Sequence, residues 1–277
     1  MKSNLKANIK KGLWLLLCLP VLLLTTACGT DVTGELNTKA TCNTTGAYTT
    51  ASTKAELTEA IGEQTSVNTA GYRLTMTTSM GEGRDMEINM IVKGEELALK
   101  ATAPASMMGD ATATGVIDYY MFFKDGKIYM EMPYQNQTYK IYMEMNFGDL
   151  FGVEASAGLT MSTPLDDMPF HDVQSMLEAI NEAGDNVVVT KDGNNFKIVV
   201  SEGFNFDDDV TVTEATCYIN FDSSNHLTAM QIDFEGNSDG SAMTGSATLS
   251  GYTGALNFPS FNDYKSMYEV MAEMMRS

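Results

Sequence analysis

The sequence predicts an α+β protein in which a strongly curved antiparallel sheet, a half-barrel, has helices packed on its concave side. Between residues 72 and 251, apolar and polar residues alternate with a period of two, as in strands that bury one face. Segments 53–67, 171–183 and 261–276 instead space apolar residues three and four apart, which is typical of helices. Because strands twist, a long antiparallel sheet curls, and these helices would cover its concave side.

The strands are predicted in two groups. The first group comprises 72–80, 85–92, 96–100, 117–123, 128–132 and 139–145, and the second comprises 187–190, 196–200, 210–221, 227–234 and 242–251. Asp125-Gly126 lies between two such runs and is a strong hairpin signal. A Gly-rich stretch at 146–163, with a short helix near 148–153, separates the groups. One sheet shared by both groups is the simplest arrangement.

The N-terminus has the layout of an export signal. A basic start is followed by an apolar run at 13–24, which is shorter than the roughly 20 residues that a spanning helix needs. Next comes Thr25-Thr26-Ala27-Cys28-Gly29, which resembles the lipobox of bacterial lipoproteins. We therefore expect a signal peptide at 1–27 and a lipidated (palmitate-type acylated) Cys28 at the new N-terminus. The alternative is a plain secretory signal cut near Ala27, with Cys28 an ordinary thiol.

Residues 28–52 are rich in Thr, Asn, Gly and Ala, which predicts a flexible tether. Residues 53–277 then form a single domain, expected to be a monomer. Two acyl chains would hold the protein on a membrane without a spanning helix. The predicted location is the extracytoplasmic side of the cell membrane or cell envelope, and which membrane is left open.

The net charge excludes one class of partner, and the cysteines leave two possible states. Cleavage after residue 27 leaves 13 basic and 36 acidic residues, a net charge of −23. Such a chain is repelled by nucleic acid, which excludes a nucleic-acid partner. Cys42 and Cys217 could pair in an exported protein. The favoured interpretation is a buried free Cys217, because it shares a strand face with Ile219 and Phe221.

No catalytic set is found, so the protein is expected not to be an enzyme and to need no cofactor. His171 and His226 are predicted to be exposed, at a helix start and at a turn. The triplet 207–209 consists of three Asp residues that could collect calcium, but adjacent acids on a strand point to alternate sides. A solvated loop is the favoured interpretation, and no metal site is assigned.

The order of the predicted elements and their Met-rich composition resemble the LolA/LppX-like group of bacterial lipoproteins. The resemblance rests on the lipobox, the following helix, the Met-rich strands at 85–94 and 123–133, and the late hairpin 218–234, and it covers about residues 53–260. That family has an incomplete β-barrel, with helices as a lid over a concave side that holds acyl chains. The resemblance thus implies a lipid-binding half-barrel without catalytic residues, and the terminal helix 261–276 does not map onto the family.

Methionine is the unusual residue of this chain, with 21 copies. Pairs two apart project from one face of a strand. A flexible, polarizable lining suits a cavity for a hydrophobic ligand such as a lipid. The ligand-cavity positions predicted on this basis are Met76, Met86, Ile88, Met90, Leu99, Met121, Met130, Met132, Met143 and Met145.

Three functions follow from these residues. The first is a non-enzymatic lipoprotein that binds a hydrophobic ligand in the Met-rich cavity. The second is a cell-surface interaction or structural lipoprotein whose core is filled, since Met also packs ordinary cores. The third is a Cu(I)-binding protein that uses paired Met, because thioethers are soft ligands.

Overall fold

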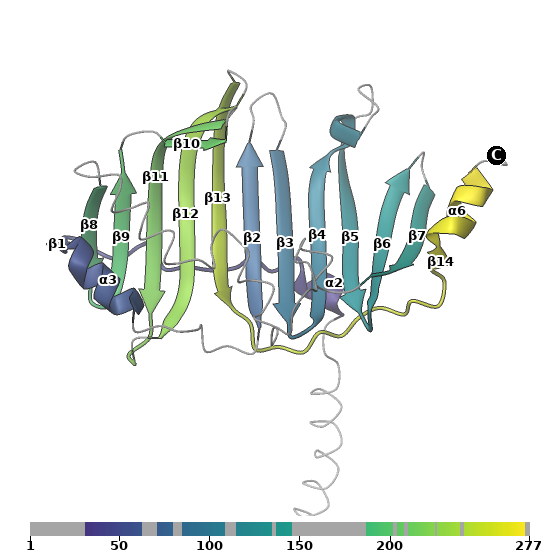
Figure 1. Ribbon diagram of the computed structural model, residues 1–277, viewed down its shortest axis with the longest axis horizontal. Helices are drawn as coiled ribbons and strands as arrows, with labels where there is room; N and C mark the ends of the chain where they lie inside the picture. The colour runs from purple at the N-terminus through teal and green to yellow at the C-terminus, as the bar shows by residue number, and fades with distance from the viewer. Residues whose placement is uncertain are drawn as a thin grey trace, which may run out of the picture.

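The computed structural model is built around one wide sheet of 14 strands (Figure 1). It describes residues 31–62, 71–79, 85–108, 115–134, 137–145, 187–201, 204–207, 210–224, 226–238 and 241–274. The strand order is β1-β8-β9-β11-β12-β13-β2-β3-β4-β5-β6-β7-β14, and β10 pairs with β11 outside this path. The two strand groups of the sequence therefore join through β13 and β2 into one sheet.

The elements follow the sequence pattern closely in the strands. The strands are β1 (Thr50–Ala51), β2 (Tyr72–Ser79), β3 (Asp85–Lys93), β4 (Glu96–Pro104), β5 (Val116–Lys124), β6 (Lys127–Tyr134), β7 (Gln137–Glu144), β8 (Val187–Asp192), β9 (Asn195–Val200), β10 (Phe204–Asp207), β11 (Val210–Phe221), β12 (Leu227–Ser238), β13 (Ser241–Gly251) and β14 (Lys265–Ser266). The helices are α2 (Val32–Glu35), α3 (Lys54–Gly62), α6 (Met267–Met274) and the 3₁₀ helix η1 (Ala105–Met108).

Strand pairing is antiparallel throughout except between β14 and β7, which are parallel. The hairpin predicted at Asp125-Gly126 joins β5 to β6, and both turn residues have positive φ, 51° and 70°. Positive φ at two central residues matches the right-handed twist of the flanking strands. Gly94 and Gly193 take the same backbone region in the turns β3–β4 and β8–β9.

The predicted fold class is wrong. The sheet is open and mixed, with few and short helices, and it is not a half-barrel with helices packed on a concave side. The α-helices in the described ranges have four, nine and eight residues. Period-two alternation shows which side of a strand is apolar, but not which segment covers that side. Here largely non-helical segments of the chain, which contain only the four-residue helix α2 among the described residues, cover one face.

The helix predictions have mixed outcomes. The described part of the helix expected at 53–67 is α3, which begins with Thr53 and Glu56 hydrogen-bonded to each other as a capping box. At the C-terminus the helix begins only at Met267, because residues 262–263 form a turn and Lys265–Ser266 form the strand β14. The segments 148–153 and 171–183 lie outside the described residues. None of the helices in the ranges given above is long and apolar enough to cross a membrane.

Residues 31–51 lie against the sheet, although a flexible tether is expected over 28–52. The backbone N–H of Ala40 donates to Thr75 Oγ1 at 2.8 Å, and that of Ala47 donates to Asp192 Oδ2 at 2.9 Å. β1 then pairs with β8 at the far side of the sheet. Docked backbone replaces a free tether in this stretch, whereas the signal peptide and the cleavage before Cys28 stay predictions.

The apolar core consists of three clusters, two of which join the sheet to other segments. In the first, Leu57 of α3 packs on β8, β9, β11 and β12. In the second, Val32 and Leu36 lie with Tyr252 and Leu256 on the central strands β3, β4 and β5. In the third, every member comes from the sheet strands or from Met145 directly after β7. The third cluster is the one that holds most of the predicted ligand positions.

Candidate ligand-binding face

The ten predicted ligand positions lie on one face of strands β2–β7, which we call the methionine face. Register alone shows this, because directly paired residues point to the same side of a sheet. Met76 is opposite Ile88, Met90 is opposite Leu99, and the row continues through Met121 and Met130. Met132 pairs with Tyr139 and Met143 with Ile128, which continues the face onto β7.

The opposite side of the same strands we call the strap face. It carries every charged residue of β2–β7, and the methionine face carries none. The charged residues are Arg73, Lys93, Lys100, Lys124, Lys127 and Lys140, with Asp85, Glu87, Glu96, Asp118, Glu131 and Glu144. The methionine face thus spans six strands without any charged residue. Exposing such a face to water is unfavourable unless something apolar covers it.

Burial of the methionine face falls off along the strands. Met90 is 4 % exposed, in the centre of the sheet, whereas Met132 near the end of β6 is 40 % exposed. The others, Met76, Met86, Ile88, Leu99, Met121, Met130, Met143 and Met145, are half-buried. These side chains therefore keep part of their flexible, polarizable apolar surface exposed.

The same face looks different at the β8–β9 side of the sheet, where α3 lies (Figure 1). There Leu57 is fully buried against Ile198 and Ile219. The single charge on that part of the face, Lys191 of β8, is paired with Glu56 of α3 at 3.3 Å. A described helix thus completes the core over one end of the sheet, while the methionine cluster has no described helix among its members.

Two strap segments complete the strap face. The N-terminal strap, residues 31–51, places α2 on the centre of the sheet, and the C-terminal strap, residues 252–264, crosses β3–β7. Phe261 stacks on Tyr129 with ring centroids 3.8 Å apart, and Phe258 meets Phe122 edge-on. Where the two straps meet, the N–H of Val32 donates to the carbonyl of Asn257 at 2.9 Å.

Buried ion pairs and hydrogen bonds fix these straps. Arg73, 7 % exposed, donates to Glu35 Oε2 at 2.7 Å and to the carbonyl of Thr38 at 3.0 Å. Tyr264 donates its hydroxyl proton to Glu131 at 2.7 Å. Burial and this carboxylate together raise the pKa of Tyr264 well above its usual range. A phenol with such a pKa remains a donor at every physiological pH.

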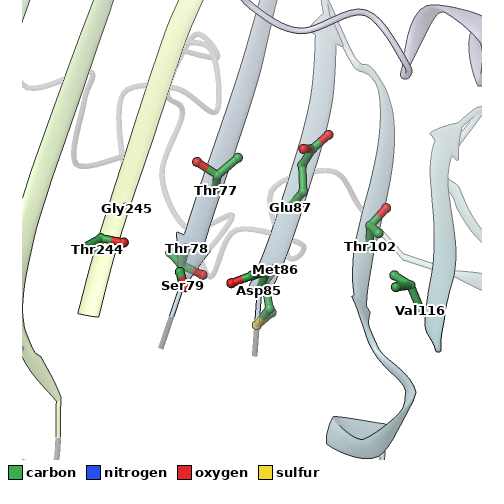
Figure 2. Close-up of a pocket in the computed structure, with 10 residues that line it drawn as sticks. All are labelled: Thr77, Thr78, Ser79, Asp85, Met86, Glu87, Thr102, Val116, Thr244 and Gly245. Atoms are coloured by element: carbon green, nitrogen blue, oxygen red, sulfur yellow. The ribbon is translucent and has the colours of Figure 1, made fainter. Parts of the chain in front are cut away.

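A polar hollow of about 620 Å³ lies at the end of the sheet where β2 ends and β3 begins. Figure 2 shows its wall, with Thr77, Glu87 and Thr102 on three neighbouring strands and Val116 on the next. Of the ten predicted positions only Met86 contributes to it. The hollow is therefore distinct from the predicted ligand face, and nothing in the sequence analysis indicated it.

The carboxylate of Glu87 in this hollow is already engaged. It accepts hydrogen bonds from Lys39 of the N-terminal strap and, at 2.8 Å, from Asn89. Burial by itself would raise the pKa of Glu87, but these two donors hold it below its usual value. The group thus belongs to the contacts that fix the strap, and it has no proton to give at neutral pH.

The cysteines do not form a reactive pair. Cys42 and Cys217 are both free: Cys217 belongs to β11, and Cys42 of the N-terminal strap contacts that strand from the strap face. Cys42 donates to Asn220 Oδ1 on the strap face, whereas Cys217 lies in the cluster under α3. Burial raises the pKa of Cys42 to about 12, and burial also raises that of Cys217. Both remain protonated thiols, which makes them poor nucleophiles and poor metal ligands.

The histidines and the Asp triplet form no metal site in the part of the chain that the structure describes. His226 lies exposed at the β11–β12 turn, with Nδ1 3.2 Å from Asp222 Oδ2. Asp207 ends β10, while Asp208, Asp209 and His171 lie outside the described residues. Within the described ranges no three His, Cys, Asp or Glu side chains gather as a metal site requires.

Comparison with known proteins does not assign this chain to a family. No protein-family model and no curated protein matches the sequence. A LolA superfamily protein from Nitrosomonas europaea is similar at 12 % identity, over 73 % of this chain and 94 % of that chain, with a TM-score of 0.22. GphF dehydratase 1 is similar at 8 % identity, over 69 % and 80 %, with a TM-score of 0.15. Neither TM-score shows a shared fold, so the LolA/LppX-like resemblance stays a prediction.

Proposed function

We propose that the protein is a lipid-anchored, non-enzymatic envelope protein that binds a hydrophobic ligand on the methionine face. One observation carries the proposal: all charges of β2–β7 lie on the strap face, and the opposite face is apolar, half-exposed and rich in Met. Burying apolar area releases about 25 cal/mol per Å², so such a face attracts an apolar partner. Anchoring through Cys28 is supported by the basic, apolar and lipobox segments of the N-terminus.

The chemistry of the face limits the ligand. It offers thioethers, methyl groups and aromatic edges, and its polar atoms are few, such as the Thr78 and Tyr119 hydroxyls. Without a charged partner an anionic or cationic group on the ligand would lose its hydration without compensation. The ligand portion in contact with this face is therefore an uncharged aliphatic chain, with any head group outside it.

The ligand proposal is tested on protein gently extracted from its membrane, by native mass spectrometry and by uptake of a fluorescent fatty acid. Met132→Asp places a charge at a 40 % exposed position of the face, and Met267→Asp does the same at a 36 % exposed position of α6. We expect at least tenfold weaker uptake by the first variant and unchanged uptake by the second. No uptake by the unaltered protein, or equal uptake by both variants, would refute the proposal.

The anchor is tested separately. The intact mature protein should carry the mass of acyl chains on residue 28, and Cys28→Ala should move the protein from the membrane to the soluble fraction. An unmodified thiol at residue 28 would remove the anchor and leave the ligand proposal standing. The two parts of the function can therefore fail independently.

A further inference from the structure

The proposed lipid anchor lies very close to a fixed point of the fold. Only two residues separate Cys28 from Asp31, which is the N-cap of α2 and accepts from the N–H of Thr33. A fully extended chain spans at most about 3.6 Å per residue, so Asp31 stays within about 11 Å of the acylated residue. The domain has no long tether between it and the membrane.

The helix at this point is held firmly to the sheet. Val32 and Leu36 of the α2 region are 0 % exposed and pack on Ile91, Ala98 and Phe122. The backbone of Val32 is also hydrogen-bonded to the C-terminal strap. Pulling α2 away would expose these apolar side chains to water, so the anchor and the sheet behave as one body.

The position of α2 along the strands decides which end of the sheet is near the membrane. Ile91 pairs with Ala98 two residues before the β3–β4 turn, a distance of about 7 Å at 3.3 Å per residue. The other end of β3, at Asp85, lies six residues away in the opposite direction, or about 20 Å. We call the side with the turns at Gly94-Glu95 and Asp125-Gly126 the turn edge.

Charge favours the same side of the molecule. The strap face of β2–β7 has six basic and six acidic residues and is neutral, although the mature chain has a net charge of −23. Around the two turns, the basic strand residues Lys93, Lys124 and Lys127 are offset by the acidic residues Glu95, Glu96 and Asp125. An anionic membrane surface therefore repels this charge-balanced region less than it repels a region with the acidic excess of the whole chain.

We propose that the turn edge, with the adjoining part of the strap face, rests on the bilayer surface, and that the end of the sheet with the polar hollow points away from it. This rests on the proposed anchoring at Cys28. The anchored protein then has a fixed orientation, with Glu95 near the lipid head groups and Val116, which is 69 % exposed, far from them.

The test places a fluorophore on Glu95→Cys or on Val116→Cys in the full lipidated protein, in which Cys217 is buried and the half-buried Cys42 donates its thiol to Asn220 Oδ1. The proteins are bound to vesicles of phosphatidylcholine and phosphatidylglycerol (3:1) that contain head-group nitroxide lipids. We expect quenching at position 95 to be at least threefold stronger than at position 116. Equal quenching, or stronger quenching at 116, overturns the proposal.

Inserting ten Gly and Ser residues between Thr30 and Asp31 lengthens the link without touching the fold. We expect the quenching at position 95 to fall by at least half while the protein still sediments with the vesicles. Undiminished quenching would show that the link does not set the orientation and would overturn the proposal. Failure of the uninserted protein to sediment would instead refute the anchoring itself, an outcome seen before any quenching is measured.

Discussion

The two faces of β5 differ although the strand is the same. Phe122 points to the strap face and is 0 % exposed, surrounded by Phe258, Phe261 and the α2 helix. Met121, its neighbour in sequence, points to the methionine face and is half-buried, and its cluster consists, within the described ranges, of side chains of the sheet and Met145. One face is thus completed by the chain's own straps, and the other is the face on which we propose that a ligand binds.

The largest expected effect comes from testing these neighbours directly. Phe122→Ala removes a fully buried ring and should lower the free energy of unfolding by about 3–5 kcal/mol, as large-to-small core changes do. Met121→Ala should cost less than half as much, because its side chain is only half-buried. Urea unfolding measures both. Equal losses would mean that the methionine face is as filled as the strap face, and would contradict the ligand proposal.

A smaller effect is expected where the C-terminal strap is hydrogen-bonded. Tyr264→Phe removes the hydroxyl that donates to Glu131 and should lower the free energy of unfolding by about 1–2 kcal/mol. Tyr268→Phe is the matched control, since Tyr268 is 86 % exposed. Thermal or urea unfolding distinguishes them. If the two variants were equally stable, the strap would not depend on this bond.

The ion pair between Lys39 of the N-terminal strap and Glu87 of β3 should contribute less than about 1 kcal/mol to the free energy of unfolding, the usual size for such pairs, and this contribution should depend on pH. The folded-state pKa of Glu87 is lowered, so its carboxylate stabilises the fold at neutral pH, and this contribution is lost as the pH falls through that pKa. Glu87→Gln should thus be less stable than the unaltered protein at pH 7 and equally stable near pH 3.

Glu144→Gln is the control for this pH series. Its carboxylate is 79 % exposed and 3.8 Å from Lys127, so we expect no resolvable difference at either pH. A Glu87→Gln difference that persisted unchanged at pH 3 would contradict the assigned role of the ion pair.

The smallest effect is expected from replacing methionine by a similar apolar residue. Changing Met130, Met132, Met143 and Met145 together to Leu should leave fatty-acid uptake within about threefold, because Leu and Met fill similar volumes. The fold is checked by circular dichroism. If the unaltered protein bound Cu(I) and this variant did not, the result would support the copper-binding hypothesis, because the variant lacks the thioether sulfur atoms.

Sequence patterns predicted the strands well because alternation fixes register. A slip of β3 by one residue would move Met86 and Met90 to the strap face and bring Glu87 and Asn89 onto the methionine face. That is why all ten predicted positions lie on one face. The Asp125-Gly126 hairpin was predictable for a similarly local reason, since its backbone needs residues that tolerate positive φ.

The straps were not predictable in the same way. Residues 31–51 contain few large apolar side chains, and the composition suggested a tether, yet Val32 and Leu36 are completely buried. A segment without periodicity carries no signal for the surface it will cover. At the C-terminus, Tyr264 and Met267 share helical spacing, but Tyr264 is buried before the helix starts and Val270 is the buried residue within it.

By itself, the sequence determined which residues share a face, because the side-chain period of a strand is a local property of its backbone. It also determined the uncharged composition of the methionine face and the export pattern at the N-terminus. Only the tertiary structure decided that β13 joins β2, that the sheet is open, and that two extended straps cover one side of it. Those features depend on contacts between residues far apart in the chain, for which local periodicity holds no information.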